Sequence, residues 1–300
     1  MALRKRGTTT TKEATRTRMV TVRAKGGKRR VCLPDMPEGQ APAEPAASFV
    51  LGLHGGNGDA ETFARRSGMM SGLHAYGHDI AFPQARRHWA DGRPPLERGW
   101  AADLDLIETL REQHHKALDR EVPLALVGSS NGGMFSLRLA CELSPAPAIA
   151  VAVVAAMPEA LAERLEGEER PVPVMLVQGT EDVMIPWHGG EVPSMGGFAA
   201  GGRLLSADDT AAFWRARNRT QETPRVKQGR IAGLPVRIEY WPAGDGGADL
   251  WRVVVKGGTH RILDNAPRRL RAGTLEDLIS RTVVWYTDPE RLSAMGTGGP

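Results

Sequence analysis

Six residues between an apolar run and a segment of helical periodicity constrain this chain more than any other feature of its sequence. The run 122–127, VPLALV, has the composition of a buried strand, and the segment 134–141, MFSLRLAC, has apolar residues at helical spacing. Between them lies GSSNGG, residues 128–133, which contains the pattern G-x-S-x-G. A strand that turns sharply into a helix favours glycine, because the turn leaves no room for Cβ atoms. The pattern therefore predicts a nucleophile elbow that holds the Ser130 hydroxyl above the end of a sheet.

Two further candidate catalytic residues, Asp182 and His260, each come just after a predicted strand. A serine hydroxyl needs a base to take its proton, and the base needs an acid to orient it. The C-terminal ends of parallel strands share one edge of a sheet, so both side chains are expected beside the elbow. The sequence therefore predicts a triad of Ser130, Asp182 and His260, with Glu181 as the alternative acid that faces solvent.

Two backbone amides are predicted to stabilise the oxyanion that such a serine would generate on a substrate carbonyl. One belongs to Asn131, the residue after the nucleophile, and the other to Gly56 in the loop after the predicted strand 48–53. His54 opens this loop, and we expect its side chain to order the loop rather than to perform chemistry. His54 and Asn57 are also candidates for contact with the substrate.

A long polar loop, residues 84–99, is predicted at the same rim, and loops of that length in a compact domain are usually functional. Its Arg86 and Arg87 would favour an anionic acyl or leaving group, because guanidinium groups bind carboxylates in a bidentate manner. The alternative is a solvated basic loop. Three tryptophans in loops near the rim are candidates either for an acyl pocket or for loop packing: Trp89, Trp100 and Trp187.

Strands that alternate with helices predict a three-layer α/β fold with a mostly parallel sheet and an N-terminal antiparallel hairpin. The expected strands are 19–24, 29–33, 48–53, 79–83, 122–127, 149–157, 172–177, 236–241 and 251–255. The expected helices are 59–76, 102–118, 134–141, 206–217 and 275–286. We predict one domain over residues 17–288, a disordered basic tail over 1–16 and a flexible tail over 289–300.

Composition and charge limit the kinds of molecule or membrane that the chain is expected to bind. The chain has 300 residues, of which 41% are apolar, and no apolar run is long enough to cross a membrane. The net charge of +4 comes from arginines scattered along the chain without interleaved aromatic residues, so no nucleic-acid partner is expected. The basic, polar N-terminus lacks the apolar region of a secretory signal, which predicts a cytoplasmic protein, or a secreted one if the N-terminus was trimmed. Cys32 and Cys141 are expected to be free thiols.

No metal or other cofactor is expected. The histidines His74, His78, His114 and His115 do not have the spacing of a metal site. No glycine-rich phosphate-binding loop follows a predicted strand.

The chain resembles the polyhydroxybutyrate depolymerase and feruloyl or acetylxylan esterase group of the α/β-hydrolases. The matching segments are 53–56, 130–134, 179–182, 185–190, 211–218 and 257–260, together with Asp103 and Ile107. The resemblance covers roughly residues 18–287. It implies the α/β-hydrolase fold and a serine esterase that cleaves polyester oligomers or aryl and acyl esters through an acyl-enzyme.

Three departures from that group bear on the substrate. The oxyanion loop reads Gly-Gly-Asn where depolymerases often have a cysteine, and His260 is followed by Arg-Ile-Leu rather than Thr-Trp-Pro. The signs of secretion and of disulfide bonds that are common in the group are also missing from the sequence. Each weakens the expectation of a polyester or plant-wall substrate.

Two other functions remain open on the sequence alone. The same triad could cleave amide bonds, including those of poly(aspartic acid). A catalytically silent binding protein on the same scaffold is the alternative from a different class, and the intact triad argues against it.

Overall fold

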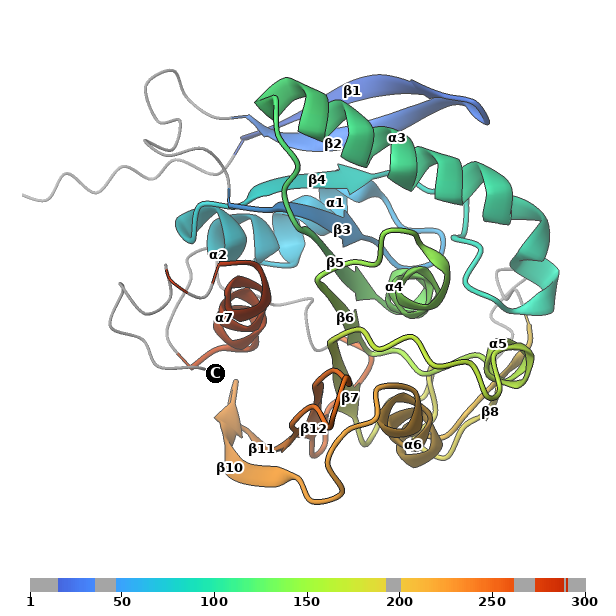
Figure 1. The fold of residues 1–300 in the computed structure, drawn as a ribbon, viewed down its shortest axis with the longest axis vertical. Coiled ribbons are helices and arrows are strands. Elements are labelled where there is room, and N and C mark those ends of the chain that lie inside the picture. Colours follow the sequence, from blue (N-terminus) through green and yellow to red (C-terminus); the bar gives the residue numbers. More distant parts are fainter. Residues whose placement is uncertain (1–15, 36–46, 193–200, 262–272, 289, 291–300) are drawn as a thin grey trace, which may run out of the picture.

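A ten-stranded sheet forms the centre of the molecule in a computed structural model that describes residues 16–35, 47–192, 201–261, 273–288 and 290 (Figure 1). The strands follow one another across the sheet in the order β1-β2-β4-β3-β5-β6-β7-β12-β11-β10. Their bounds are β1 Arg16–Ala24, β2 Gly27–Asp35, β3 Phe49–Leu53, β4 Asp79–Pro83, β5 Leu124–Ser129, β6 Ile149–Val153, β7 Val174–Gly179, β10 Arg225–Ile231, β11 Leu234–Trp241 and β12 Leu250–Val255. Two short strands, β8 Gly190–Glu191 and β9 Arg203–Leu204, pair separately.

Parallel pairing holds the middle of the sheet, from β4 through β3, β5, β6 and β7 to β12. The middle strands β3, β5, β6 and β7 are buried along almost their whole length, as expected of strands covered by helices on both faces. Antiparallel pairs extend the sheet at both ends: the predicted hairpin β1–β2, and a C-terminal hairpin β10–β11 paired to β12.

Helices cover both faces of the sheet, which gives the predicted three layers (Figure 1). The helices are α1 Ala60–Arg66, α2 Met69–Ala75, α3 Trp100–Leu118, α4 Asn131–Glu142, α5 Glu159–Arg164, α6 Ala207–Arg217 and α7 Leu275–Thr287, with a 3-10 helix η1 at Pro94–Gly99. Buried residues of α3, α4, α5 and α6 share one apolar core, and those of α1, α2 and α7 share the other. None of these helices has the length and apolar content that crossing a bilayer requires.

The structure corrects one predicted helix and contains two elements that the sequence did not predict. The single helix expected over 59–76 is two helices, because the chain breaks at Ser67–Gly68, where Gly68 has a φ of +69°. Strand β10 was missed because it lies at the sheet edge and is polar and exposed, so it shows no apolar alternation. Helix α5 has only six residues, which is too short for a clear periodic pattern.

The predicted tails fall almost wholly outside the described residues. The prediction for 1–16 overlaps the described chain only at Arg16, which begins β1 and therefore does not belong to a tail. From the predicted tail at 289–300, the structure describes residue 290 alone.

Candidate active site

The turn between β5 and α4 has the strained backbone of a nucleophile elbow. Ser130 stands at its apex with φ 55° and ψ −122°, a conformation that side-chain-bearing residues seldom adopt. A Cβ at Gly128 would lie 2.1 Å from the carbonyl oxygen of Gly132, and one at Gly132 would lie 2.1 Å from that of Leu53. The two glycines are therefore required for the turn to close against its own helix and against β3.

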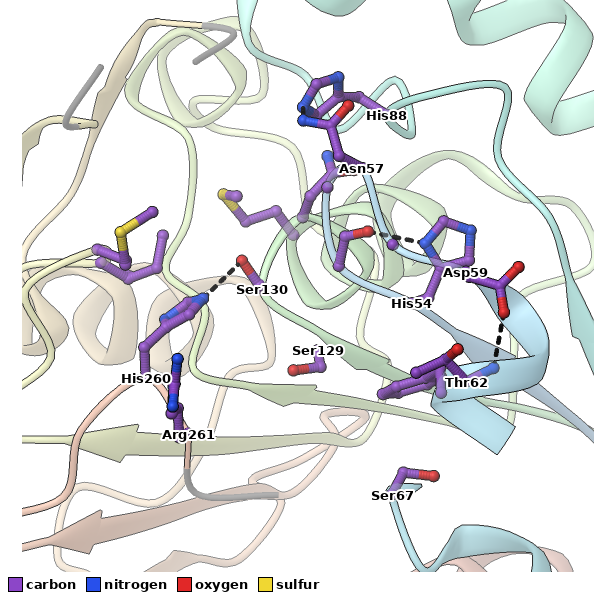
Figure 2. A pocket seen from close by; sticks show the side chains of 18 of the residues that line it. His54, Asn57, Asp59, Thr62, Ser67, His88, Ser129, Ser130, His260 and Arg261 are labelled. Carbon is purple, nitrogen blue, oxygen red and sulfur yellow. Dashed lines mark hydrogen bonds between the residues drawn. The ribbon is translucent and has the colours of Figure 1, made fainter. Parts of the chain in front are cut away.

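Ser130, His260 and Asp182 meet at the C-terminal edge of the sheet, although 130 residues separate the first two (Figure 2). The Ser130 Oγ lies 3.0 Å from the His260 Nε2. The His260 Nδ1 lies 2.8 Å from one carboxylate oxygen of Asp182 and 3.1 Å from the other. A proton can pass from the hydroxyl to Nε2 while the carboxylate holds the opposite side of the ring.

Backbone donors fix the Asp182 carboxylate. Its Oδ1 accepts hydrogen bonds from the amides of Met184 at 2.8 Å and Ile185 at 2.9 Å, and the residue is buried. Glu181, the alternative acid, has an exposed side chain. The geometry thus brings Asp182, and not Glu181, to the imidazole.

The predicted oxyanion residues lie side by side against the elbow. A Cβ at Gly55 would stand 3.4 Å from the Ser130 Cβ, and one at Gly56 would stand 3.6 Å from the Asn131 Cβ. The loop is a tight turn in which Asn57 has a φ of 52°, a left-handed conformation that asparagine tolerates better than most residues. Gly56 and Asn131 both line the cavity in front of Ser130.

The Asn131 side chain is locked by a buried network that the sequence did not reveal. Its Oδ1 accepts from the Trp89 amide at 2.8 Å, and its Nδ2 donates to the Trp89 carbonyl and, at 2.7 Å, to Asp91. Asp91 also accepts from Arg93 through Nε and Nη2. Asp91 and Arg93 stand in a segment, ADGRPP, that gave no motif signal.

His54 lines the cavity and orders the two loops beside it. Its Nδ1–H donates to the Gly55 carbonyl at 2.7 Å, and its Nε2 accepts from the Ala85 amide at 3.0 Å. Because a backbone N–H can only donate, Nε2 carries a lone pair here and the ring is neutral. Burial lowers the pKa of His54, which favours this neutral form.

A cavity of about 660 Å³ opens in front of the Ser130 hydroxyl (Figure 2). One wall comes from α1 and the residue after it, including Thr62, Arg66 and Ser67. Apolar side chains also line the cavity, from α1 and from other segments: Phe63, Met134, Val183, Met184, Ile185 and Val192. The cavity is therefore lined by both polar and apolar side chains, on the α1 wall as well as elsewhere.

The predicted substrate residues other than His54 and Asn57 lie outside this cavity. Arg86 is exposed and donates to the carbonyl of Gly26 in the β1–β2 turn, and Arg87 is exposed as well. Trp89 is fully buried and stacks on Phe135. The structure therefore does not place Arg86, Arg87 or Trp89 among the lining residues: Trp89 packs in the core and Arg86 bonds the β1–β2 turn.

The other two tryptophans also have packing roles. Trp100 begins α3 and lies under the guanidinium of Arg138, at 3.8 Å from the ring centroid. Trp187 is half-buried, with the guanidinium of Arg252 5.1 Å from its ring centroid. Neither lines the cavity in front of Ser130.

Several residues that line the cavity were not predicted to do so. They are Arg66, His88, Arg93, Met134, Met184, Val192 and Arg261, among others. His88 and Arg93 had a signal in the sequence, since both belong to the long loop 84–99. The His88 Nε2 lies 3.4 Å from the Asn57 Nδ2. In the described part of the chain, no three metal-ligating side chains gather into a metal site.

The chain is similar in sequence or in fold to proteins named as esterases. No protein-family model matches the chain. A curated protein of Nocardia uniformis, named "Putative esterase NocK", is 29% identical over 84% of this chain and 74% of its own length. Among solved structures, acetyl xylan esterase from Aspergillus awamori matches with a TM-score of 0.53 at 13% identity, over 82% of this chain and 94% of its own.

A hyperthermophilic esterase from Pyrobaculum calidifontis matches with a TM-score of 0.50 at 13% identity, over 94% of this chain and 87% of its own. At such identities the structural likeness concerns the fold alone. The chain has the α/β-hydrolase fold, as the sequence predicted.

Proposed function

We propose that this chain is a serine hydrolase that cleaves carboxylic ester bonds through a Ser130–His260–Asp182 triad. The observation that carries the proposal is the unbroken chain of contacts from the Ser130 Oγ to His260 at 3.0 Å and from His260 to Asp182 at 2.8 Å, at the wall of an open cavity. The likeness to a curated esterase and to two esterase structures supports esters as the substrate class.

Acylation begins when the His260 Nε2 accepts the Ser130 proton and the Oγ attacks the ester carbonyl carbon. The carbonyl oxygen becomes an oxyanion, which the Gly56 and Asn131 amides stabilise by donating hydrogen bonds. The intermediate collapses as His260 donates its proton to the leaving oxygen. The alcohol departs, and the acyl group remains bound to Ser130 as an ester.

Deacylation repeats these steps with water as the nucleophile. His260 takes a proton from the water, whose oxygen attacks the acyl carbonyl, and then returns the proton to the Ser130 Oγ. The carboxylic acid leaves and the enzyme is restored. Asp182 keeps the Nδ1–H of the imidazole in place through both halves and stabilises the imidazolium that forms between them.

The finer substrate assignment follows the resemblance to depolymerases and feruloyl esterases, which brings polyester oligomers and aryl esters into the set of candidates. Amide hydrolysis by the same triad, including that of poly(aspartic acid), remains the alternative within the fold. An alkoxide or phenoxide leaves more readily than an amine, so esters are the first substrates to test.

The test is hydrolysis of p-nitrophenyl acetate and butyrate by the wild type and by Ser130→Ala, together with labelling by a fluorophosphonate probe. We expect Ser130→Ala to lose about 10⁴-fold or more in kcat/KM, to fold normally and to resist the probe. Ser129→Ala is the matched control, because Ser129 is the neighbouring residue while the His260 Nε2 lies against the hydroxyl of Ser130; this variant should keep both activity and labelling.

Four outcomes would contradict the proposal. Hydrolysis by Ser130→Ala at the wild-type rate would place the nucleophile elsewhere, as would probe attachment at Ser129 in peptide mapping. An unreactive wild-type protein that still binds ester analogues would identify the silent binding protein. Faster cleavage of anilides than of matched esters would identify the amide hydrolase.

A further inference from the structure

A second cavity, of about 560 Å³, lies between the C-terminal strands of the sheet and α7, and no described residue lines both it and the cavity in front of Ser130. Its strand wall comes from β10, β11 and β12, and its helix wall comes from α7 (Figure 1). Cavities of roughly 300 to 1,000 Å³ are typical of small-molecule sites. This cavity is therefore a candidate ligand site that the proposed hydrolysis does not use.

The floor of this second cavity is apolar and aromatic. Ile238 and Tyr240 of β11 are half-buried there, and the Tyr240 ring stacks on Trp251 of β12 with the ring centroids 4.3 Å apart. The Trp251 indole donates to the Tyr286 hydroxyl of α7 at 2.9 Å, which joins the two walls. Trp285 lines the cavity from α7 and is 37% exposed. The cavity thus offers an aromatic surface against which the rings of a ligand can pack.

Two cations of β10 border this floor. Antiparallel pairing places Arg225 opposite Tyr240, and it places Lys227 opposite Ile238. Side chains directly opposite each other in an antiparallel pair share one face of the sheet, so both cations lie on the face that carries the floor. Two residues of a strand span about 7 Å, and the Arg225 Cζ lies 5.8 Å from the Tyr240 ring centroid. Both charges are therefore within reach of one small ligand.

The other charged residues of the described lining leave the cavity positive. Arg230 and Arg281 add positive charge, and Asp277 is the acid. Asp277 is buried and accepts hydrogen bonds from the Tyr76 hydroxyl and the Gly273 amide, both at 3.2 Å. In the part of the chain that the structure describes, no carboxylate forms an ion pair with either of the two β10 cations. A ligand in this cavity meets an excess of positive charge.

Charged side chains on an edge strand have another role in many proteins, which is to prevent that edge from pairing with a second chain. Strand β10 is the last strand of the sheet, so this explanation has to be compared with the first. Protection of an edge needs only the charges. It makes no use of an aromatic floor beneath them or of an exposed tryptophan on the facing helix. The combination of these features favours a ligand site.

We propose that the cavity between β10–β12 and α7 binds a small amphipathic anion, an aromatic ring system that carries a carboxylate or a sulfonate. The rings lie against Ile238, Tyr240 and Trp285. The anionic group accepts charge-assisted hydrogen bonds from Arg225 and Lys227. Binding here is independent of hydrolysis at Ser130, so the test needs no turnover.

The test compares 8-anilinonaphthalene-1-sulfonate with N-phenyl-1-naphthylamine, which has the same rings without the sulfonate. The rise in fluorescence of each compound gives its Kd for the wild type and for the double variant Arg225→Gln/Lys227→Gln. We expect the double variant to raise the Kd of the sulfonate about three- to tenfold, with little change for the neutral compound. The difference should shrink in 1 M salt, where the screening length falls to about 3 Å. Both positions are exposed, so the fold should survive.

Arg237→Gln is the matched control for charge. Arg237 stands between Val236 and Ile238 on β11 and therefore lies on the opposite face of the sheet, where its Nε is 2.7 Å from Glu239. This variant should keep the wild-type Kd for the sulfonate. Trp285→Ala should weaken the binding of both compounds, because it removes apolar contact and leaves the charges in place. An equal loss in Arg237→Gln would attribute the effect to general surface charge and overturn the site.

Hydrogen exchange locates the bound anion directly. With 2-naphthoate, amide exchange should slow in peptides that cover 225–241 and 275–287, and the neutral 2-naphthalenemethanol should have less effect at the same concentration. Slowing confined to peptides around Ser130 and His260 would place the anion in the catalytic cavity and overturn the proposal. An unchanged Kd of the sulfonate in the double variant would overturn it as well. If that variant also formed larger species in size-exclusion chromatography, the two cations would be assigned to protection of the edge strand.

Discussion

The two sides of the Ser130 hydroxyl differ in how deeply their loops are buried. On the side of the proposed oxyanion amides, called the oxyanion side, the loops after β3 and β4 are held by buried side chains: His54 is 1% exposed, and Trp89 and Asp91 are fully buried. On the acid–base side, the loops after β7 and β12 carry a more open structure, in which Val183 is 76% exposed and Arg261 is exposed as well.

The oxyanion side is joined to the core at several points. The Trp89 indole donates to the His54 carbonyl at 3.0 Å, and Asn131 bonds the backbone of Trp89 in both directions. On the acid–base side the His260 imidazole bonds the side chains of Ser130 and Asp182. Preorganised donors gain their effect from not having to move during the reaction, and the buried contacts on this side agree with the proposed oxyanion role.

This difference separates two kinds of substitution. Changes on the acid–base side should remove catalysis with little loss of stability, because few packing contacts depend on those side chains. Changes on the oxyanion side should affect stability and kcat together. Three measurements test the distinction.

The largest effect is expected for Asp182→Asn on the acid–base side. The asparagine oxygen can still accept from the Met184 and Ile185 amides, which leaves the NH₂ group facing the His260 Nδ1. The imidazole must then present a lone pair at Nδ1 and carry its proton on Nε2, where it cannot accept from Ser130. We expect kcat/KM to fall about 10⁴-fold while Tm changes little.

Glu181→Gln is the neighbouring control and should retain wild-type kinetics, since Glu181 is exposed. Similar losses of kcat/KM in the two variants would mean that Asp182 is not the acid of the triad. A large fall in Tm for Asp182→Asn would remove the contrast between the two sides.

An intermediate effect is expected for Asp91→Asn on the oxyanion side. Both Arg93 and Asn131 donate to this carboxylate, so one of them must face the amide NH₂ in the variant. Where the NH₂ faces Asn131, its side chain keeps the two hydrogen bonds to the Trp89 backbone and loses the one to residue 91, so we expect the backbone N–H at the proposed oxyanion position to be held less firmly. We expect kcat to fall between about ten- and a hundredfold with KM nearly unchanged, because a whole oxyanion donor is worth about a hundredfold or more.

Asp103→Asn separates this positioning role from stability. Asp103 forms an equally buried pair with Arg29 at 2.9 Å and accepts from the Ala90 amide, so it holds the same loop, but it does not touch Asn131. Both variants should unfold at lower temperature, since breaking a buried pair costs about 3 kcal/mol or more. Only Asp91→Asn should also lose kcat at constant KM; an equal loss in Asp103→Asn would make Asp91 a structural residue alone.

The fold was largely predictable because its signals are local. Apolar runs with glycine-rich turns identified the central strands, and the order of the motifs placed Ser130, Asp182 and His260 near one another. The same logic failed for β10, since an exposed edge strand such as 225–231 needs no apolar face. It also failed at residue 68, where a glycine in left-handed conformation divides α1 from α2.

The surroundings of the site were less predictable, because they depend on where side chains point within loops. Trp89 and Arg86 stand three residues apart in one loop, yet the first enters the core and the second bonds the β1–β2 turn. Arg66 and Arg261 come from distant segments, and nothing in their local sequence shows that they border one cavity. Loop conformation and long-range pairing decide such positions, and periodicity reports on neither.

The smallest effect concerns pH and tests whether the oxyanion side depends on a neutral His54. Burial lowers the pKa of His54 in the folded state, whereas the unfolded chain should take up a proton near pH 6.5. Below that pH the unfolded state binds more protons than the folded state, so the free energy of unfolding falls as pH drops from 7.5 to 5.5.

His54→Gln can keep both hydrogen bonds without titrating, so its Tm should decline less over that range than that of the wild type. His114, whose pKa burial also lowers, titrates in both proteins and cancels in the comparison. Parallel curves of Tm against pH for the two proteins would show that protonation of His54 does not destabilise the oxyanion side. The rigidity of that side would then depend on Trp89, Asp91 and Asn131.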